Sequence, residues 1–205
     1  SLDGRGKGRV VILQSLQVIA VIIFSYLAGS INFSIILFRL LGRGDPRAGF
    51  SGNAGVTNVY RQAGMLWAAV ILALDMGRAV GVAVAAACFL PGPAVPWAGA
   101  SLVAGNRFPV FHGFRGGKGV ANYLGFTAYL SPAAAAASCA VWVAVYGIAR
   151  VPFIASFFMV AVLAGGAVTV FWPSPGAITG TAATFVFIVA SHARNIGELV
   201  SNRKR

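Results

Sequence analysis

Residues 10–38, VVILQSLQVIAVIIFSYLAGSINFSIILF, contain no Lys, Arg, Asp or Glu. Three other stretches share this property, residues 79–106, 119–149 and 151–191. Because about 20 apolar residues in a helix cross the hydrocarbon core of a bilayer, each stretch is long enough to span a membrane. The runs are too continuous for the alternating strands of an outer-membrane barrel. The sequence therefore predicts an all-α fold, a polytopic bundle of membrane helices.

The composition of the whole chain agrees with this prediction. Of the 205 residues 58% are hydrophobic, and only 16 Lys or Arg and four Asp or Glu residues carry a formal charge. A soluble domain has about 25% charged residues. We expect one integral membrane domain over residues 1–205, with a basic N-terminal tail at 1–9 and a basic cytoplasmic tail at 192–205. The first apolar run is interpreted as a retained span, because no small-residue cleavage site follows it.

Breaks between the apolar runs predict about seven spans, at residues 10–41, 64–90, 94–110, 120–130, 132–149, 151–172 and 177–191. The first exceeds one bilayer thickness and is expected to tilt, to kink near Gly29 or to emerge into the interface. The fourth is short for a full span and is expected to be re-entrant or to be continued by the loop before it. Cytoplasmic loops carry an excess of Lys and Arg, which favours an outer N-terminus and a cytoplasmic C-terminus. This orientation places these cations inside: Arg39, Arg43, Arg47, Arg61, Arg107, Arg115, Lys118, Arg150, Arg194, Arg203, Lys204 and Arg205.

Charge and cysteine content narrow the possible partners. A net charge of +12 would suggest nucleic acid for a soluble protein, but here it follows from loop topology and anionic ligands, so no nucleic-acid partner is expected. With only four acids, a carboxylate metal cluster is excluded, and no metal or cofactor is predicted. Cys88 and Cys139 lie in apolar segments and are expected to be buried structural thiols. Asp75 and Arg78, three residues apart within a span, are expected to form an ion pair.

The first of three chemically distinctive stretches is SGNAGVTNVYR, residues 51–61. Its glycines let successive N–H groups converge on an anion, and its hydroxyls, amides and Arg61 suit phosphate. The expected phosphate contacts from this stretch are Ser51, Gly52, Asn53, Thr57, Asn58 and Arg61. A solvated turn with a helix N-cap at Thr57 or Asn58 is the alternative.

The second stretch is GNRFPVFHGFRGGKG, residues 105–119, and the third is SHARN, residues 191–195. Gly116, Gly117 and Lys118 precede an expected helix, where an N-terminus favours anions; topogenic charge is the alternative for Lys118. The pattern fails the Walker A spacing, because Gly119 follows the lysine. The phenylalanines at 108, 111 and 114 are expected at the membrane interface. His192 and Asn195 are expected to share one side of a helix.

Four ordered segments, GSINFS at 29–34, SGNAGVTNVYR at 51–61, GNRFPVFHGFRGGKGVAN at 105–122 and HARNI at 192–196, resemble the acyl-phosphate-dependent glycerol-3-phosphate acyltransferases (PlsY). The resemblance covers nearly the whole chain. It implies a seven-helix bacterial inner-membrane enzyme with its active site at the cytoplasmic face. The implied reaction moves an acyl group from acyl phosphate to the 1-hydroxyl of glycerol 3-phosphate.

Site residues also follow from the resemblance. The implied catalytic residues are Ser51, Arg61, Lys118, His192 and Asn195, and the implied phosphate-binding residues are Gly52, Asn53, Thr57, Asn58, Gly116 and Gly117. Neither histidine has an aspartate five residues later, so the His-Asp pair of many glycerolipid acyltransferases is missing.

The chain departs from the family pattern in several places. Phe50, Asn32, Asn106 and Arg78 stand where the family usually has Gly, Pro, His and Lys, and Asn202 and Lys204 replace a Gly and a Glu. The sequence is thus similar to a divergent member. The competing interpretation is a transporter, or a non-catalytic binder, of phosphorylated anions or lipids.

Overall fold

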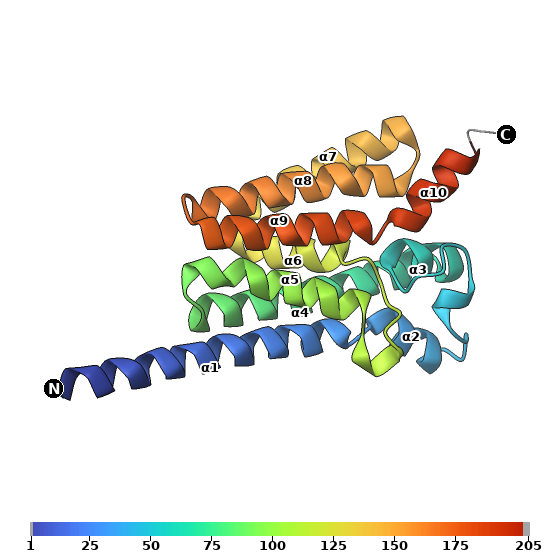
Figure 1. The fold of residues 1–205 in the computed structure, drawn as a ribbon. Helices are drawn as coiled ribbons and strands as arrows, with labels where there is room; N and C mark the ends of the chain where they lie inside the picture. Colours follow the sequence, from blue (N-terminus) through green and yellow to red (C-terminus); the bar gives the residue numbers. More distant parts are fainter. Residues whose placement is uncertain (1, 203–205) are drawn as a thin grey trace.

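The computed structural model describes residues 2–202, with side chains described for residues 6–201, and this part of the chain is helical without a β-strand (Figure 1). The α-helices are α1 (Leu2–Ser30), α2 (Phe33–Leu40), α3 (Val56–Ala63), α4 (Met65–Phe89), α5 (Val95–Arg107), α6 (Val120–Leu130), α7 (Pro132–Ala149), α8 (Pro152–Phe171), α9 (Pro175–Ala190) and α10 (Ala193–Asn202). Short 3₁₀ turns are η1 (Pro46–Ala48), η2 (Gly92–Ala94) and η3 (Val110–His112).

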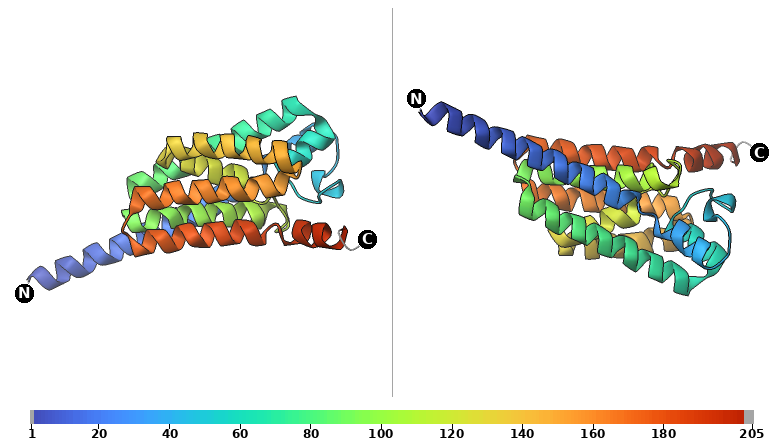
Figure 2. Two further views of the ribbon diagram at one scale, coloured as in Figure 1. Left: turned by 90° about the horizontal axis from the view of Figure 1, so that it is seen from above. Right: turned by 90° about the horizontal axis from the view of Figure 1, so that it is seen from below.

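The long helices lie side by side in one bundle. α5 packs between α1 and α9, and α4 packs on α6. α7 packs on α8, and α8 also packs on α9. The N-terminal half of α1 extends beyond the bundle, and the two chain ends lie at opposite ends of the molecule (Figure 2). The short helices α2, α3 and α10 gather at the end where the C-terminus lies (Figure 1). Most chain outside the long helices is therefore concentrated at that end.

Each expected span after the first coincides with one helix, and the first, residues 10–41, contains part of α1 and all of α2. The number of membrane crossings stays a prediction. Within residues 2–202, four helical segments are long and apolar enough to cross a membrane, or five if α9 and α10 form one broken span. α5 and α6 have 13 and 11 residues, which at about 1.5 Å per residue is shorter than the hydrocarbon core. The all-helical prediction is confirmed for the described residues.

The described parts of both predicted tails are mostly helical. Residues 2–9 continue α1, and residues 193–202 form α10, because neither stretch contains a proline and helix hydrogen bonding propagates cheaply once started. The expected kink near Gly29 is a true break, since α1 ends at Ser30 and α2 begins at Phe33. The cations counted at positions 203–205 lie outside the described residues.

Small residues allow α1 and α5 to touch through their main chains. A Cβ atom on Gly29 would overlap with the main-chain oxygen of Leu102, and one on Gly105 would overlap with that of Tyr26. Glycine at such positions lets helix backbones approach closely, which drives packing where lipid weakens the hydrophobic effect. The contact fixes the spacing of the two helices.

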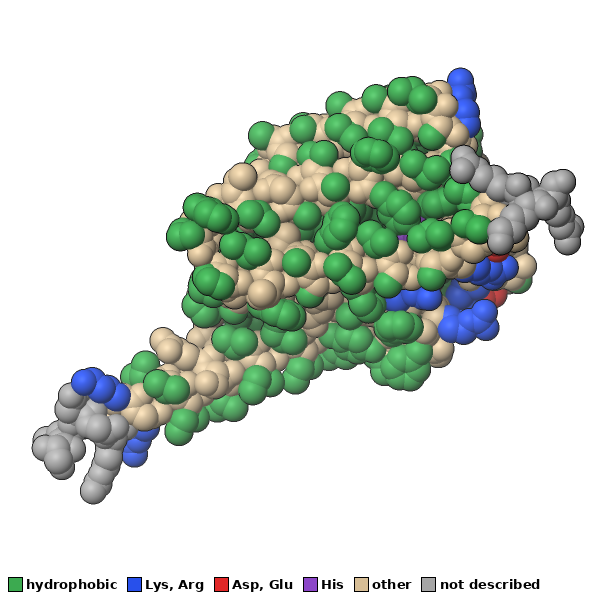
Figure 3. All heavy atoms as spheres, turned by 45° about the horizontal axis from the view of Figure 1, so that its top comes forward, with side chains coloured by type: hydrophobic (Ala, Val, Ile, Leu, Met, Phe, Trp, Pro, Cys, Tyr) green, Lys and Arg blue, Asp and Glu red, His purple; other side chains and the backbone are tan. Residues whose placement is uncertain are grey.

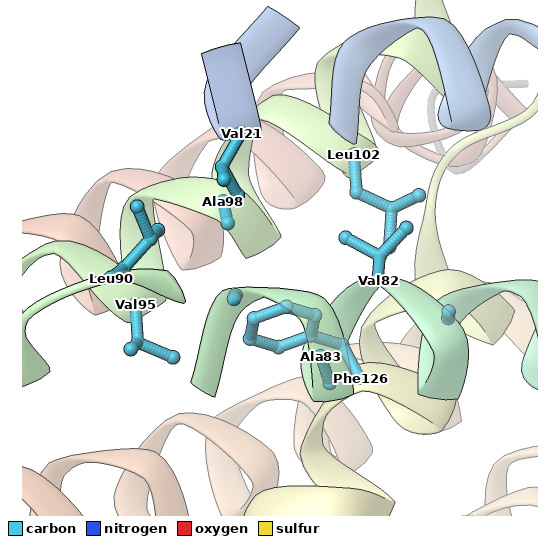
Figure 4. Packing of buried hydrophobic residues seen from close by; sticks show 10 residues of the cluster. Val21, Val82, Ala83, Leu90, Val95, Ala98, Leu102 and Phe126 are labelled. Carbon is cyan, nitrogen blue, oxygen red and sulfur yellow. The ribbon is translucent and has the colours of Figure 1, made fainter. Parts of the chain in front are cut away.

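Buried apolar side chains fill the space between α1, α4, α5 and α6. This cluster includes Val21, Val82, Ala83, Leu90, Val95, Ala98, Leu102 and Phe126 (Figure 4). Apolar side chains also cover the outside of the bundle (Figure 3). Cys88 and Cys139 are exposed on this outer surface, so the prediction of buried thiols was wrong. In a bundle that faces lipid, an apolar setting in the sequence does not separate inside from outside.

The predicted ion pair within α4 is confirmed. Nη2 of Arg78 lies 2.8 Å from Oδ1 of Asp75, and both side chains are 8% exposed. A buried charge without a partner is costly, and this pairing offsets part of that cost for both residues.

Candidate active site

The first motif forms a loop before α3 that the side chain of Asn58 holds together. Its Nδ2 atom donates to the main-chain oxygens of Pro46, Gly49 and Asn53 at 2.7, 3.3 and 2.7 Å. Asn58 is 1% exposed, and its amide is engaged by the loop itself. This expected phosphate ligand therefore shapes the loop from within.

Other expected ligands of the first motif lie on the outside of the loop. Nδ2 of Asn53 donates to Oγ of Ser51 at 3.0 Å, so these two side chains are neighbours. Gly52 between them has φ +65°, a left-handed conformation that glycine adopts without steric cost. The three residues leave polar side-chain groups on one side of the loop, while the N–H of Gly52 donates to the main-chain oxygen of Gly49 at 3.1 Å.

Helix α3 begins at Val56 with Gly55 as its N-cap and no side-chain cap. The alternative of an N-cap at Thr57 or Asn58 was therefore wrong. Thr57 and Arg61 stand four residues apart on α3 and both are exposed. Such residues share one face of a helix. The hydroxyl of Thr57 and the guanidinium of Arg61 thus lie on the same exposed face of α3.

The glycines of the second motif allow its loop to lie against the end of α5. A Cβ atom on Gly117 would come within 2.6 Å of Oδ1 of Asn106, and one on Gly116 would overlap with the Asn106 main-chain oxygen. The N–H of Gly117 donates to that same oxygen at 3.0 Å. Gly116 and Gly117 therefore have a packing role that places Lys118, the next residue.

Contacts between the loops bring the three motifs together. The N–H of Ala54 donates to the main-chain oxygen of Gly116 at 3.2 Å, which joins the first motif to the second. Nζ of Lys118 donates to Oδ1 of Asn195, which joins the second motif to the third. Arg194 lies beside the first loop, because a Cβ atom on Gly52 would be 3.0 Å from its Nη1. Contacts that span 62 and 77 residues of sequence thus join the three motifs into one cluster.

The surroundings of Lys118 are strongly positive. Burial and, after it, the charge of Arg107 lower the pKa of its ammonium to about 8. Arg194 and Arg61 act weakly in the same direction, whereas Glu198 opposes them. Cations that repel one another in a partly dehydrated place gain from a bound anion. Cations gather at this end of the molecule, as the space-filling view shows (Figure 3).

His192 differs from expectation in its placement. It lies in the turn before α10, and the α9–α10 pair bends by 43° there. The ring is 3% exposed, with Nδ1 2.8 Å from the main-chain oxygen of Ile188 and an edge contact with Phe157. Asn195 instead reaches Lys118. His192 precedes the first residue of α10, so the two residues do not lie on one helix. Burial and, after it, the charge of the Lys118 that Asn195 contacts lower the pKa of the His192 ring.

Sequence reasoning missed two residues that join the loops, Arg47 and Asn106. Nη1 of Arg47 donates to the main-chain oxygens of His112 and Arg115 at 2.7 and 2.6 Å, and its Nη2 pairs with Asp45. The spacing of two residues in GDPRAG could have indicated the local ion pair. Nothing local could have indicated the contact with a loop 65 residues away.

A surface hollow of about 460 Å³ lies where Arg47 meets the second loop, and it is lined by Asp45, Arg47, Ala48, His112, Gly113 and Arg115.

An apolar groove of about 500 Å³ lies between α1, α5 and α9. Its lining consists of Val18, Ile22, Ala94, Trp97, Ala100, Ser101, Ala104, Ala183 and Phe187. Phe187 makes an edge contact with Phe108 at 6.0 Å, and Phe108 follows Arg107 at the end of α5. The groove and the cations are thus neighbours. Together they suit a molecule with an anionic head and an apolar tail.

Comparison with known proteins agrees with this arrangement. The family model described as glycerol-3-phosphate acyltransferase matches residues 19–202. A glycerol-3-phosphate acyltransferase of Pseudomonas savastanoi pv. phaseolicola is 37% identical over 183 residues, covering 89% of this chain and 94% of the relative. One of Jannaschia sp. is 35% identical and covers 89% of each chain.

Solved structures are similar as well. The crystal structure of PlsY, an integral membrane glycerol 3-phosphate acyltransferase, in its glycerol 3-phosphate form has a TM-score of 0.83 and 30% identity, covering 91% of this chain and 93% of that one. Its lysophosphatidic acid form has a TM-score of 0.80 and 29% identity with the same coverage. With its apolar helices, the chain is a membrane protein, and it belongs to the glycerol-3-phosphate acyltransferase family.

Proposed function

We propose that the protein transfers a fatty acyl group from acyl phosphate to the 1-hydroxyl of glycerol 3-phosphate, giving lysophosphatidic acid and inorganic phosphate. The observation that carries this proposal is the cluster around Lys118, where three motifs rich in cations and glycines meet beside an apolar groove. Both substrates carry a phosphate, and one carries an acyl chain. The cluster and the groove match these two parts.

The hydroxyl oxygen attacks the acyl carbon, and the bond from that carbon to the phosphate oxygen breaks. The hydroxyl proton passes to an oxygen of the leaving phosphate, so the protein need not supply a strong base. Negative charge grows on that phosphate during the step, and fixed cations stabilise such charge in the transition state. Lys118 and Arg61 are assigned to this role.

Hydrogen-bonding groups complete the proposed site. Ser51, His192 and Asn195 bond a phosphate or the nucleophilic hydroxyl, and Gly52, which has no side chain, lets the phosphate approach the main chain of the first loop. Asn53 contributes from the first loop, and Thr57 contributes from the first turn of α3. Asn58, Gly116 and Gly117 act indirectly, since their contacts in the structure shape and place the loops.

The proposed setting is a bacterial inner membrane with seven crossings, an outer N-terminus and the site at the cytoplasmic face. The bias of loop cations supports this orientation. The cluster lies at the end that holds α10 and the C-terminus (Figure 1), and glycerol 3-phosphate is a soluble cytoplasmic anion. The acyl donor reaches the groove from the membrane.

The test supplies purified protein in detergent with acyl phosphate and glycerol 3-phosphate and measures lysophosphatidic acid and released phosphate. We expect equal amounts of the two products with acyl phosphate and none with acyl-CoA. Equal rates with acyl-CoA would contradict the proposed donor. Uptake of glycerol 3-phosphate into proteoliposomes without any product would instead indicate a transporter.

A further inference from the structure

A buried polar network around Arg78 lies apart from the cation cluster. Nη2 of Arg78 is 2.8 Å from Oδ1 of Asp75 and 2.5 Å from Oδ1 of Asn122 on α6. Its Nη1 donates to the main-chain oxygen of Ile31, and its Cζ lies 5.0 Å from the centre of the Phe33 ring. One side chain therefore connects α4 and α6 with the break between α1 and α2, at Ile31, and with the first residue of α2, Phe33.

Asn32 continues this network from the break to the first loop. It is 2% exposed, and all its hydrogen-bonding positions face protein. Its Oδ1 accepts the N–H of Ile35 at 3.2 Å and so caps α2. Its Nδ2 donates to the main-chain oxygen of Ala54 at 3.4 Å, and its own N–H donates to Nε2 of His112 at 3.4 Å.

Ala54, in the first loop, forms a hydrogen bond to the second loop. Its N–H donates to the main-chain oxygen of Gly116 at 3.2 Å, two residues before Lys118. Consecutive contacts thus run from Arg78 in the bundle, through the break and the first loop, to the residue proposed to hold phosphate.

The chemistry of the network suggests why a charge is kept inside the bundle. Replacing a buried ion pair with apolar residues is often neutral or stabilising, so the pair alone gives little reason for an arginine here. A broken helix, however, leaves main-chain oxygens without helical partners, and these need donors when they are away from water. Arg78 supplies such a donor at Ile31.

We propose that Arg78 and Asn32 are positioning residues of the acyltransferase site. They touch no substrate, and they fix where the first loop sits against the loop of Lys118. This inference rests on the proposed function, because its main readout is the reaction with glycerol 3-phosphate.

The test uses Arg78→Gln, Asn32→Ser and the double variant. Serine still caps a helix but is too short to bridge to Ala54, so only that link is lost. Misplacement by about 1 Å can cost about 10²-fold; we expect each single variant to lose about that much kcat/KM for glycerol 3-phosphate, mainly through a higher KM. Since both changes break one path, the double variant should lose no more than the worse single one. Arg78→Lys should recover part of the loss.

Ser34→Ala is the matched control. Ser34 lies in α2, is 1% exposed, and its Oγ has no hydrogen-bond partner among the described residues. Its removal should leave the kinetics unchanged. A merely structural role predicts lower melting temperatures but an unchanged KM in the folded variants, and losses that multiply in the double variant. Either result would overturn the proposal.

A second readout separates this proposal from the proposed function. If the wild type forms no product, the function fails, and positioning is then measured by the rise in melting temperature that inorganic phosphate causes. We expect this rise in the wild type and in Ser34→Ala, and a smaller one in Arg78→Gln and Asn32→Ser. Equal rises in all four proteins would overturn the positioning role.

Discussion

Lys118 offers the sharpest test of the site, because its charge is adjustable by pH as well as by substitution. Burial and Arg107 lower its pKa to about 8, from an ordinary value of about 10.4. In the free enzyme the Lys118 side chain is therefore positively charged below about pH 8, and it loses this charge as the pH rises through that value. If the charge holds phosphate, kcat/KM should fall about tenfold per pH unit above about 8, since kcat/KM reports the free enzyme.

Substitution separates the charge from its titration. Lys118→Arg keeps a cation that stays charged at all accessible pH, so the decline above about pH 8 should disappear, although the maximal rate falls because the geometry changes. Lys118→Ala removes a charge-assisted contact worth roughly 2 to 5 kcal/mol. At about 1.4 kcal/mol per tenfold, kcat/KM should drop roughly 30-fold to several thousand-fold.

The assay is release of inorganic phosphate from acyl phosphate in the presence of glycerol 3-phosphate, between about pH 6 and 9.5. The second phosphate ionisation near pH 6 affects wild type and variant alike, so the alkaline side carries the comparison. A folded Lys118→Ala protein that keeps more than about half of wild-type turnover would refute the phosphate role. The same alkaline decline in Lys118→Arg would refute the assignment of the pKa.

Three further outcomes are expected. A Cys at position 44 should react with a membrane-impermeant reagent only from the cytoplasmic side, and one at position 173 only from outside; labelling of both from one side would contradict the orientation. Gly117→Ala should lose most activity, because the added Cβ would lie 2.6 Å from Oδ1 of Asn106, whereas Gly197→Ala, with nothing within 4 Å, should retain it; equal turnover of the two would argue against the packing role. EDTA should leave activity unchanged, since no group of three or more possible metal ligands occurs within the described residues; inhibition that magnesium reverses would refute this.

The sequence predicted local features better than contacts between distant segments. Asp75 and Arg78 pair as their spacing of three indicates, because one helix turn brings them together. The contacts of Arg78 with Ile31 and Asn122 span 47 and 44 residues and depend on how the helices pack. Shared composition of the three motifs indicated one site, and their contacts agree with that, but only packing reveals which atoms join them.

The predictions that Cys88 and Cys139 are buried were wrong for one physical reason. In a membrane bundle, the helix faces toward the core and the helix faces toward lipid are both apolar. Cys88 and Cys139 lie in apolar runs yet face outward, and hydropathy holds no signal for that difference. The misplacement of His192 has another cause. Its ring contacts the main-chain oxygen of Ile188, and the residue lies in the turn before α10, outside the helix that carries Asn195.

The glycine contact between α1 and α5 has a mechanical consequence. Where helices meet through long side chains, a change of rotamer can shift them, but main chain against main chain leaves no rotamer to change. Gly29 and Gly105 therefore make this spacing stiff. Since α5 ends at Arg107, the same contact fixes where that cation lies relative to α1.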